Sequence, residues 1–302
     1  METITEEHGE DWKQLLRSQV ITSFIGNPQE QLHACAKVGY YYMCCAPSSL
    51  YKYYGDSLEK LDMIKRNKMW YSAPCNFNDV FDCDISINEN EVFKSVVKMV
   101  PGDMEIRAGS QMWKHLKQTI TPKIRLFQTE LEQLRSSTGI SCLSELDDSL
   151  LMWAHYANNH RGMCVEYDLM EFNTQLRYTP VPVIYSDKRV CVSTLDPASL
   201  EKNIQGIFIE SLTSKSLDWQ YENEWRIIRD SGACGKRWIS EKKGALLDAP
   251  HPKSIVLGCM VRPEFEAAVQ SYCKEQKINL YKMQKAKAEY RLEKVSVLEF
   301  DN

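Results

Sequence analysis

Hydrophobic positions recur at two spacings along this chain, and the two spacings predict different elements. Apolar residues every three or four positions over 10–24 predict a helix, which ends at Gly26 because glycine and the proline that follows interrupt helices. A second, shorter helix is predicted over 29–38. Pro47 then stands in a turn-forming segment, so residues 1–47 are interpreted as a helical N-terminal extension.

From residue 48 onward, short aromatic and β-branched segments alternate with segments of helical spacing. Strands are predicted at 49–54, 68–72, 140–143, 163–167, 181–185, 224–229 and 254–260, with two more near the C-terminus. Helices are predicted at 58–67, 147–158, 197–214 and 263–276, and over 89–135 with breaks near Pro101 and Pro122. Strict strand–helix–strand alternation is absent, so we expect a single α+β domain over 48–302 with a central, mostly antiparallel or split sheet.

The composition is that of an ordinary globular protein and limits the classes of function. Of 302 residues, 43% are hydrophobic, and no apolar run approaches the roughly 20 residues of a membrane helix. The acidic, polar start lacks the basic beginning and apolar middle of a secretory signal, so a cytoplasmic location is expected. A net charge of −4 argues against a broad basic nucleic-acid-binding face. Glycine-rich phosphate loops of the P-loop and Rossmann types are absent from the sequence.

Eleven cysteines is a high number, but their spacing indicates neither a zinc site nor a disulfide framework. No Cys-x-x-Cys pair occurs, and Cys44 and Cys45 are the only two that are close in sequence. Most of the others, such as Cys142, Cys164 and Cys259, lie in apolar, strand-like segments. We therefore expect free, mostly buried thiols that pack as small hydrophobic side chains, and no bound metal.

The segment Tyr221–Ile228 carries the strongest indication of chemistry. Glu222 and Glu224 are two residues apart where a strand is predicted, and side chains at i and i+2 of a strand share a face. Two adjacent carboxylates disfavour joint ionisation, an arrangement that an acid–base site uses and a scaffold does not need. The alternative is an exposed strand edge on which Glu224 pairs with Arg226. The aromatic residues around the segment favour a pocket.

A second group of candidates lies on the helix predicted over 147–158 and just after it. His155 is a natural proton carrier at neutral pH, but a histidine next to Trp153 is most often structural. Tyr156 and His160 are likewise either boundary residues of the helix or members of a site.

A third group lies in a polar loop between the strand at 68–72 and the helices that follow. Asn78 and Asp79 are expected mainly to stabilise a turn through hydrogen bonds to their own backbone. Positioning of a substrate is the second interpretation. Binding of a divalent metal together with Asp82 is the third.

Four segments, in the same order along the chain, resemble a family of bacterial and phage proteins described as domain of unknown function 2971. The resemblance covers about residues 48–300, and its most specific blocks read Phe-Asn-Asp-x-Phe-Asp and Met-Trp-x-His-Tyr. The segments are Leu50–Tyr53, Met69–Asp82, Leu151–Gly162 and Tyr221–Arg226.

The order of these parts is also similar to that of ADP-ribosyltransferases. The resemblance implies that Lys52 holds the pyrophosphate or ribose of NAD and that Glu224 stabilises the oxocarbenium-like centre formed as nicotinamide leaves. It further implies that Glu222 helps to activate the nucleophile. The fold expected is an ADP-ribosyltransferase-like split sheet whose segments around residues 52, 72 and 224 meet in one cleft. The residues expected at that cleft are Lys52, Tyr53, Tyr71, Ser72, Asn78, Asp79, Trp153 and Tyr156, with Glu224, Glu222 and His155 as catalytic residues.

Two positions depart from the pattern of those enzymes. Lys52 stands where they carry arginine or histidine, and Tyr71-Ser72-Ala73-Pro74 lacks the Ser-Thr-Ser-like run of the arginine-modifying branch. The leading hypothesis is an NAD-dependent ADP-ribosyltransferase or NAD glycohydrolase with a protein or nucleic-acid acceptor, acting as a toxin, effector or phage-defence enzyme. The alternatives are a non-enzymatic nucleotide- or peptide-binding sensor of a defence system, and a metal-dependent nuclease that uses Asp79, Asp82 and the glutamates.

Overall fold

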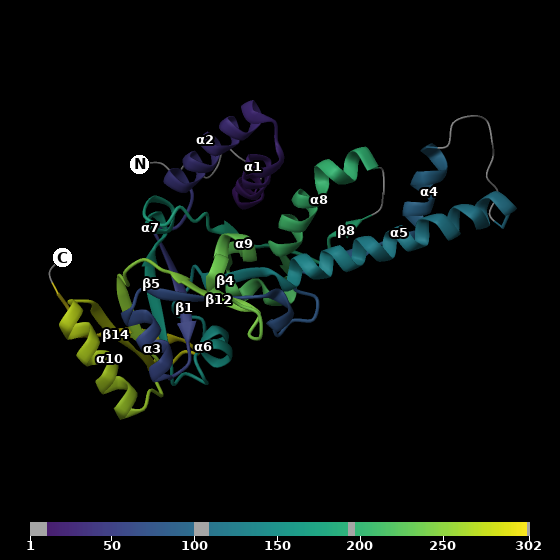
Figure 1. Ribbon diagram of the computed structural model, residues 1–302. Helices are drawn as coiled ribbons and strands as arrows, with labels where there is room; N and C mark the ends of the chain where they lie inside the picture. Colours follow the sequence, from purple (N-terminus) through teal and green to yellow (C-terminus); the bar gives the residue numbers. More distant parts are fainter. Residues whose placement is uncertain (1–10, 100–108, 193–196, 301–302) are drawn as a thin grey trace. The chain divides into compact units, whose positions relative to one another are not determined.

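The chain forms two compact units, each assembled from separated stretches of sequence. The computed structural model describes residues 11–99, 109–192 and 197–300 (Figure 1). Unit 1 contains the described residues up to Gly39 and those of Ala73–Thr138 and Ile184–Leu217. Unit 2 contains Tyr40–Ser72, Gly139–Val183 and the described residues from Asp218 onward. The division between the units therefore does not coincide with the boundary predicted at residue 47.

Unit 2 is built around a mostly antiparallel sheet. Its strands are β1 (Ser49–Tyr54), β2 (Lys68–Ser72), β4 (Thr138–Ser144), β5 (Met163–Asp168), β6 (Val181–Pro182), β10 (Glu224–Asp230), β11 (Trp238–Ile239), β12 (Gly244–Asp248), β13 (Ser254–Leu257), β14 (Asn279–Lys285) and β15 (Leu292–Leu298). They follow the order β11-β12-β2-β4-β1-β5-β13-β14-β15, and β10 pairs with β4 and β6. Strands β13 and β14 pair in parallel, whereas β1 pairs antiparallel with both β4 and β5. The predicted α+β class with a largely antiparallel sheet is confirmed.

Short helices cover the sheet of unit 2. They are α3 (Leu58–Lys65), α6 (Leu150–Tyr156), α7 (Leu169–Thr174), α9 (Ser231–Cys234) and α10 (Pro263–Gln276), with the 3-10 turns η3 (Leu217–Glu222) and η4 (Gly235–Arg237). Helix α3 packs beside α10, and α6 packs on β1 (Figure 1). Ser149 begins α6, because its hydroxyl accepts a hydrogen bond from the Met152 N–H.

The core beneath α6 is centred on Trp153. This side chain is fully buried, its ring lies edge-on to Tyr53 at 5.3 Å, and its indole N–H donates to the Asp147 carbonyl at 2.7 Å. The chain then turns back over the sheet at Gly162. A Cβ at Gly162 would lie 1.9 Å from the Tyr54 carbonyl oxygen, so only glycine permits this close approach of two backbones.

Unit 1 is mainly helical. Its elements are α1 (Trp12–Ile25), most of α2 (Pro28–Cys44), η2 (Pro74–Asn76), α4 (Glu89–Met99), α5 (Gln111–Ser136), α8 (Pro197–Leu212), and the short strands β3 (Ser86–Ile87), β7 (Ile184–Ser186), β8 (Cys191–Val192) and β9 (Ser214–Ser216). Helix α1 packs on α8, and α4 packs against α5 at a steep angle (Figure 1). Arg17 of α1 donates to the Ser214 hydroxyl at 2.9 Å, which ties that helix to the end of α8.

Two predicted elements differ in the structure. Helix α5 continues through Pro122, so the predicted break there is wrong. Proline removes a helical hydrogen bond, but Ile120 and Ile124 on the same helix are buried against α4, and this packing keeps the helix continuous. The strand predicted at 181–185 is divided between β6 and β7, which belong to different sheets. The break predicted near Pro101 lies outside the described residues.

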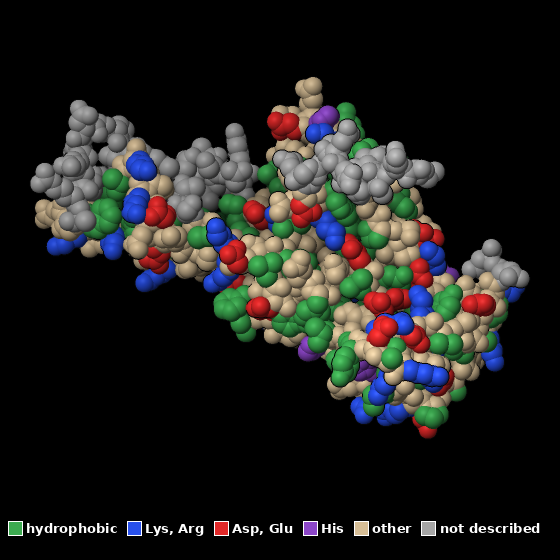
Figure 2. All heavy atoms as spheres, turned by 180° about the vertical axis from the view of Figure 1, so that it is seen from behind, with side chains coloured by type: hydrophobic (Ala, Val, Ile, Leu, Met, Phe, Trp, Pro, Cys, Tyr) green, Lys and Arg blue, Asp and Glu red, His purple; other side chains and the backbone are tan. Residues whose placement is uncertain are grey.

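The surface charges and the burial of the cysteines agree in part with what the sequence predicts. Acidic and basic side chains are interspersed on the face shown in Figure 2. Across the described ranges, no helix has the combined length and apolar character that spanning a bilayer requires. All eleven cysteines are free thiols, as predicted, but only some are buried. Cys83, Cys164, Cys234 and Cys273 are buried, Cys45, Cys142 and Cys259 are half-buried, and Cys35, Cys44, Cys75 and Cys191 are exposed.

Candidate functional site

Glu224 begins β10 and is held by Arg226, two residues along the same strand. The Arg226 guanidinium donates to both carboxylate oxygens, from Nε to Oε1 at 2.8 Å and from a terminal nitrogen to Oε2 at 2.9 Å. Arg226 is fully buried, and Glu224 is 4% exposed. The Glu224–Arg226 pair expected for an exposed strand edge is therefore present. It lies in the interior, however, where each charge depends strongly on its partner.

Lys52 of β1 and Cys142 of β4 lie next to this pair. Lys52 Nζ donates to the Cys142 carbonyl oxygen at 2.8 Å. Burial lowers the pKa of Lys52 to about 8, and the nearby Glu224 charge acts in the opposite direction. Burial also raises the pKa of the Cys142 thiol well above its usual range, and the charge of Glu224 adds to this. A half-buried cation, a buried acid and a half-buried thiol therefore lie next to one another.

Ser72 borders the same strand from β2. It lies opposite Ile140 of β4, and Cys142 is two residues further along that strand. At the usual strand rise, these two positions are about 7 Å apart. The segments around residues 52, 72 and 224 thus all border β4.

Glu222 does not share a strand face with Glu224, which corrects the prediction. Glu222 ends η3, Asn223 has a φ of 42°, and β10 starts only at Glu224. A left-handed residue between them breaks the alternation on which the i, i+2 rule depends. Glu222 is instead 2% exposed and accepts a hydrogen bond from the Tyr156 hydroxyl at 2.5 Å.

Contacts to the end of β4 hold the junction between η3 and β10 in place. The Ser144 hydroxyl donates to the Glu222 carbonyl oxygen at 2.6 Å, and the Glu145 N–H donates to the Asn223 carbonyl at 3.1 Å. The Trp225 indole N–H donates to the Glu145 carboxylate at 2.6 Å. Both glutamates are therefore positioned by the sheet rather than by a mobile loop.

A row of rings lies beside the Glu222–Tyr156 pair. His155 is exposed, and its ring centroid lies 6.2 Å from that of Tyr156 and 6.4 Å from that of Tyr221. Tyr221 in turn lies 6.0 Å from Trp219. Such partly exposed rings offer flat faces on which a base or nicotinamide can stack.

The segment that carries these residues matches a known family. Residues 152–227 match the model of the protein family of unknown function DUF2971. The predicted resemblance is confirmed over this segment, which runs from α6 to β10 and includes Tyr156, Glu222 and Glu224. No curated protein and no solved structure matches the chain.

Three residues predicted to contact NAD lie in the interior of unit 2. Trp153 and Tyr71 are fully buried, and Tyr71 packs edge-on against Tyr178 at 6.2 Å. Tyr53 is 9% exposed, and its hydroxyl donates to the Leu146 carbonyl at 2.8 Å. These rings therefore pack the core and offer no face to a ligand, which corrects the prediction for them.

Asn78 and Asp79 belong to unit 1, whereas the glutamates belong to unit 2. The Asp79 carboxylate accepts a hydrogen bond from the Phe81 N–H at 2.9 Å, which is the turn interaction expected of this loop. Asp82 is buried and forms an ion pair with Lys215 at 3.6 Å. Among the residues that the structure describes, no group of three histidine, cysteine or acidic side chains is arranged to hold a metal ion.

Two residues next to Glu224 were not among the predicted site residues. Arg226 was considered only as a surface partner of Glu224, although its position two residues later on the strand indicates a shared face. Cys142 was interpreted as a packing residue, because nothing in its neighbourhood in the sequence shows that β10 pairs with β4. Only the strand order brings the thiol next to Glu224.

Proposed function

We propose that unit 2 binds NAD and breaks its nicotinamide–ribose bond, passing ADP-ribose to a protein or nucleic-acid acceptor, or to water when no acceptor is bound. The observation that carries the proposal is the meeting of Lys52 with the Glu224–Arg226 pair at β4. The Glu222–Tyr156 pair lies at the end of η3, two residues before Glu224.

The roles follow from charge and position. With a pKa of about 8, Lys52 is mostly an ammonium ion at neutral pH and attracts the pyrophosphate. As the C1′–N bond breaks, nicotinamide leaves with the bonding electrons, and the charge of Glu224 stabilises the oxocarbenium-like ribose. Glu222 accepts the proton of the incoming hydroxyl or water, while Tyr156 orients the carboxylate. The rings of Tyr221 and His155 offer the stacking surface.

A module that binds the same ligand without cleaving it is the second candidate. The observation that favours this binding module is that Arg226 donates hydrogen bonds to both carboxylate oxygens of Glu224. A carboxylate held in this way supplies a fixed charge, whereas cleavage also requires an acid group that changes its hydrogen bonds during the reaction.

The test begins with the unaltered chain. Thermal unfolding is measured with NAD, ADP-ribose and divalent ions, and nicotinamide release is followed with and without a chelator. We expect NAD to raise the melting temperature and release to be insensitive to the chelator. Absence of any NAD-dependent shift overturns the proposal, and chelator-sensitive cleavage of nucleic acid supports the nuclease alternative.

Variants then separate cleavage from binding. Glu224→Gln and Glu222→Gln are each expected to reduce nicotinamide release about 100-fold or more, while Glu241→Gln on an exposed position leaves it unchanged. Circular dichroism checks folding, because Glu224→Gln leaves a buried guanidinium with a weaker partner. A wild-type chain that binds NAD without releasing nicotinamide favours the binding module.

A further inference from the structure

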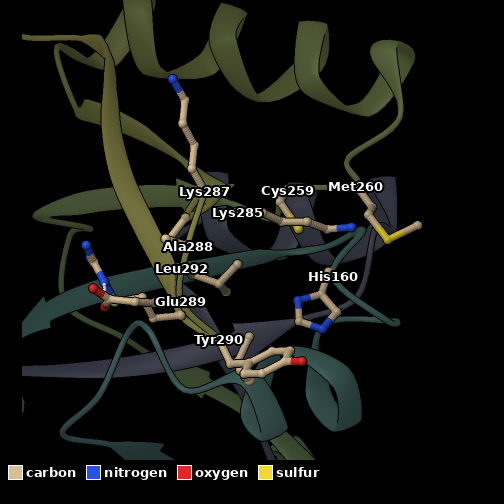
Figure 3. Close-up of a pocket in the computed structure, with 12 residues that line it drawn as sticks. His160, Cys259, Met260, Lys285, Lys287, Ala288, Glu289, Tyr290 and Leu292 are labelled. Carbon is tan, nitrogen blue, oxygen red and sulfur yellow. Dashed lines mark hydrogen bonds and ion pairs between the residues drawn. The ribbon is translucent and has the colours of Figure 1, made fainter.

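A cavity of about 680 Å³ lies in unit 2 between the β14–β15 hairpin and the turn that follows α6 (Figure 3). The hairpin loop at 286–291 forms one wall, and His160, Cys259 and Met260 form the other. Its volume is in the range of small-molecule sites. None of the residues assigned to NAD lines it.

The hairpin wall carries positive charge that the described residues do not neutralise. Glu289 pairs with Arg291 at 2.5 Å, and Arg291 also pairs with Glu293 at 2.8 Å. In the part of the chain that the structure describes, no carboxylate forms an ion pair with Lys285. Figure 3 shows the Lys285 ammonium pointing toward the side of His160 and Met260. An anion in the cavity would therefore meet an uncompensated cation.

The opposite wall offers a polar atom whose hydrogen-bonding capacity is unused. His160 Nδ1 is buried and has no hydrogen-bond partner among the described residues. The backbone of His160 is held in place, since its N–H donates to the Trp153 carbonyl at 3.0 Å and its carbonyl accepts from the Met260 N–H at 2.9 Å. A buried polar atom without a partner is unfavourable, so a ligand that bonds to Nδ1 is stabilised there.

The mouth of the cavity is aromatic and apolar. The Tyr290 side chain lines the cavity and is fully exposed. Met260 and Leu150, which line the same cavity, are also exposed. An exposed ring beside two apolar side chains suits a planar ring that stacks.

We infer that this cavity binds a small anion that carries a planar ring, of the nucleoside monophosphate class. The phosphate contacts Lys285, the ring stacks on Tyr290, and a ligand polar group bonds to His160 Nδ1. The inference goes beyond the proposed function, because it requires neither NAD nor the two glutamates.

Isothermal titration calorimetry of the full chain with AMP, adenosine and inorganic phosphate tests the inference. We expect AMP to bind at least about tenfold more tightly than either part alone, because charge and stacking act together. Lys285→Ala and Tyr290→Ala are each expected to weaken AMP binding about tenfold. Lys236→Ala, which removes an exposed lysine outside the cavity, is expected to leave it unchanged.

Each remaining outcome is decisive. Absence of AMP binding, or equal AMP affinity in Lys285→Ala, Tyr290→Ala and Lys236→Ala, overturns the inference. AMP binding that is lost in Tyr221→Ala but retained in Lys285→Ala places the nucleotide at the proposed NAD site and also overturns it. Failure of NAD binding alone affects only the proposed function, because AMP binding is measured separately.

Discussion

Lys52 is half-buried and its pKa is lowered by burial, so the free energy of unfolding depends on pH. Its pKa is about 8 in the folded chain, below the usual value of 10.5. Between these values the unfolded chain binds the additional proton, and stability therefore rises with pH through this window. From about pH 7 to about pH 10, we expect wild type to gain about 1–3 kcal/mol over Lys52→Met, measured by urea unfolding.

The control for Lys52 is an exposed lysine of the same unit. Lys236→Met is expected to shift the unfolding free energy by the same small amount at every pH, because an exposed ammonium is equally hydrated in both states. Parallel pH curves for wild type and Lys52→Met would show that the ammonium does not lie in a desolvated position.

The hydrogen bond between Tyr156 and Glu222 makes a second prediction for a single residue. Tyr156→Phe removes a donor to a carboxylate that is 2% exposed, and a hydrogen bond to a charged group contributes more than a neutral one. We expect a loss of about 1–3 kcal/mol in the free energy of unfolding, measured with denaturant at neutral pH. Tyr290→Phe is the matched control, since its fully exposed hydroxyl is hydrated in both states and should change stability by less than about 0.5 kcal/mol.

At the scale of elements, two glycines with opposite surroundings test how the turn after α6 is built. A Cβ at Gly162 would overlap the Tyr54 carbonyl, whereas a Cβ at Gly39 within α2 meets no atom within 4 Å. Gly162→Ala is expected to destabilise the chain by at least about 2 kcal/mol. Gly39→Ala is expected to stabilise it by about 0.5–1 kcal/mol, because alanine favours a helix. Thermal and denaturant unfolding check both, and equal effects would contradict the close backbone approach.

The elements could be predicted from sequence where local spacing decides them. Strands at 49–54, 68–72 and 163–167 and the helix at 263–276 lie within a residue or so of the observed β1, β2, β5 and α10. Prediction failed where packing overrides a local signal. Pro122 should interrupt a helix, but the buried face of α5 keeps it continuous.

Local sequence patterns also fail to predict parts of the candidate site. The acidic pair was visible in the sequence, but the left-handed Asn223 between Glu222 and Glu224 was not, and it moves the two side chains off a common face. The resemblance to ADP-ribosyltransferases placed Tyr71 and Trp153 in the site, but aromatic rings both stack ligands and fill cores. Sequence spacing does not distinguish these roles, and burial assigns both residues to the core.

At the scale of the whole molecule, each unit is assembled from separated segments. Strand β4 is flanked by β1 and β2, which precede it by many residues, and by β10, which follows it. Such long-range pairings are set by the total burial of the sheet and leave no local pattern. The meeting of Lys52 with Glu224 could therefore be expected only through the resemblance to ADP-ribosyltransferases, and the presence of Cys142 beside them could not be expected at all.

The distribution of thiols gives a prediction for the entire chain. Iodoacetamide, read out by mass spectrometry, should label Cys35, Cys44, Cys75 and Cys191 first in the native protein, because they are exposed. Cys142 should react slowly although it is only half-buried, because burial and the Glu224 charge raise its pKa and deplete the thiolate. Buried Cys83, Cys164, Cys234 and Cys273 should react only after denaturation.

Denaturation without a reducing agent then separates two kinds of protection. A thiol that is protected by packing reacts once the chain unfolds, so all eleven cysteines should take up the label. A disulfide would remain intact under these conditions and leave pairs of cysteines unlabelled. Fast labelling of Cys142 in the native chain would instead show that its thiolate is abundant and accessible, which contradicts the raised pKa expected beside Glu224.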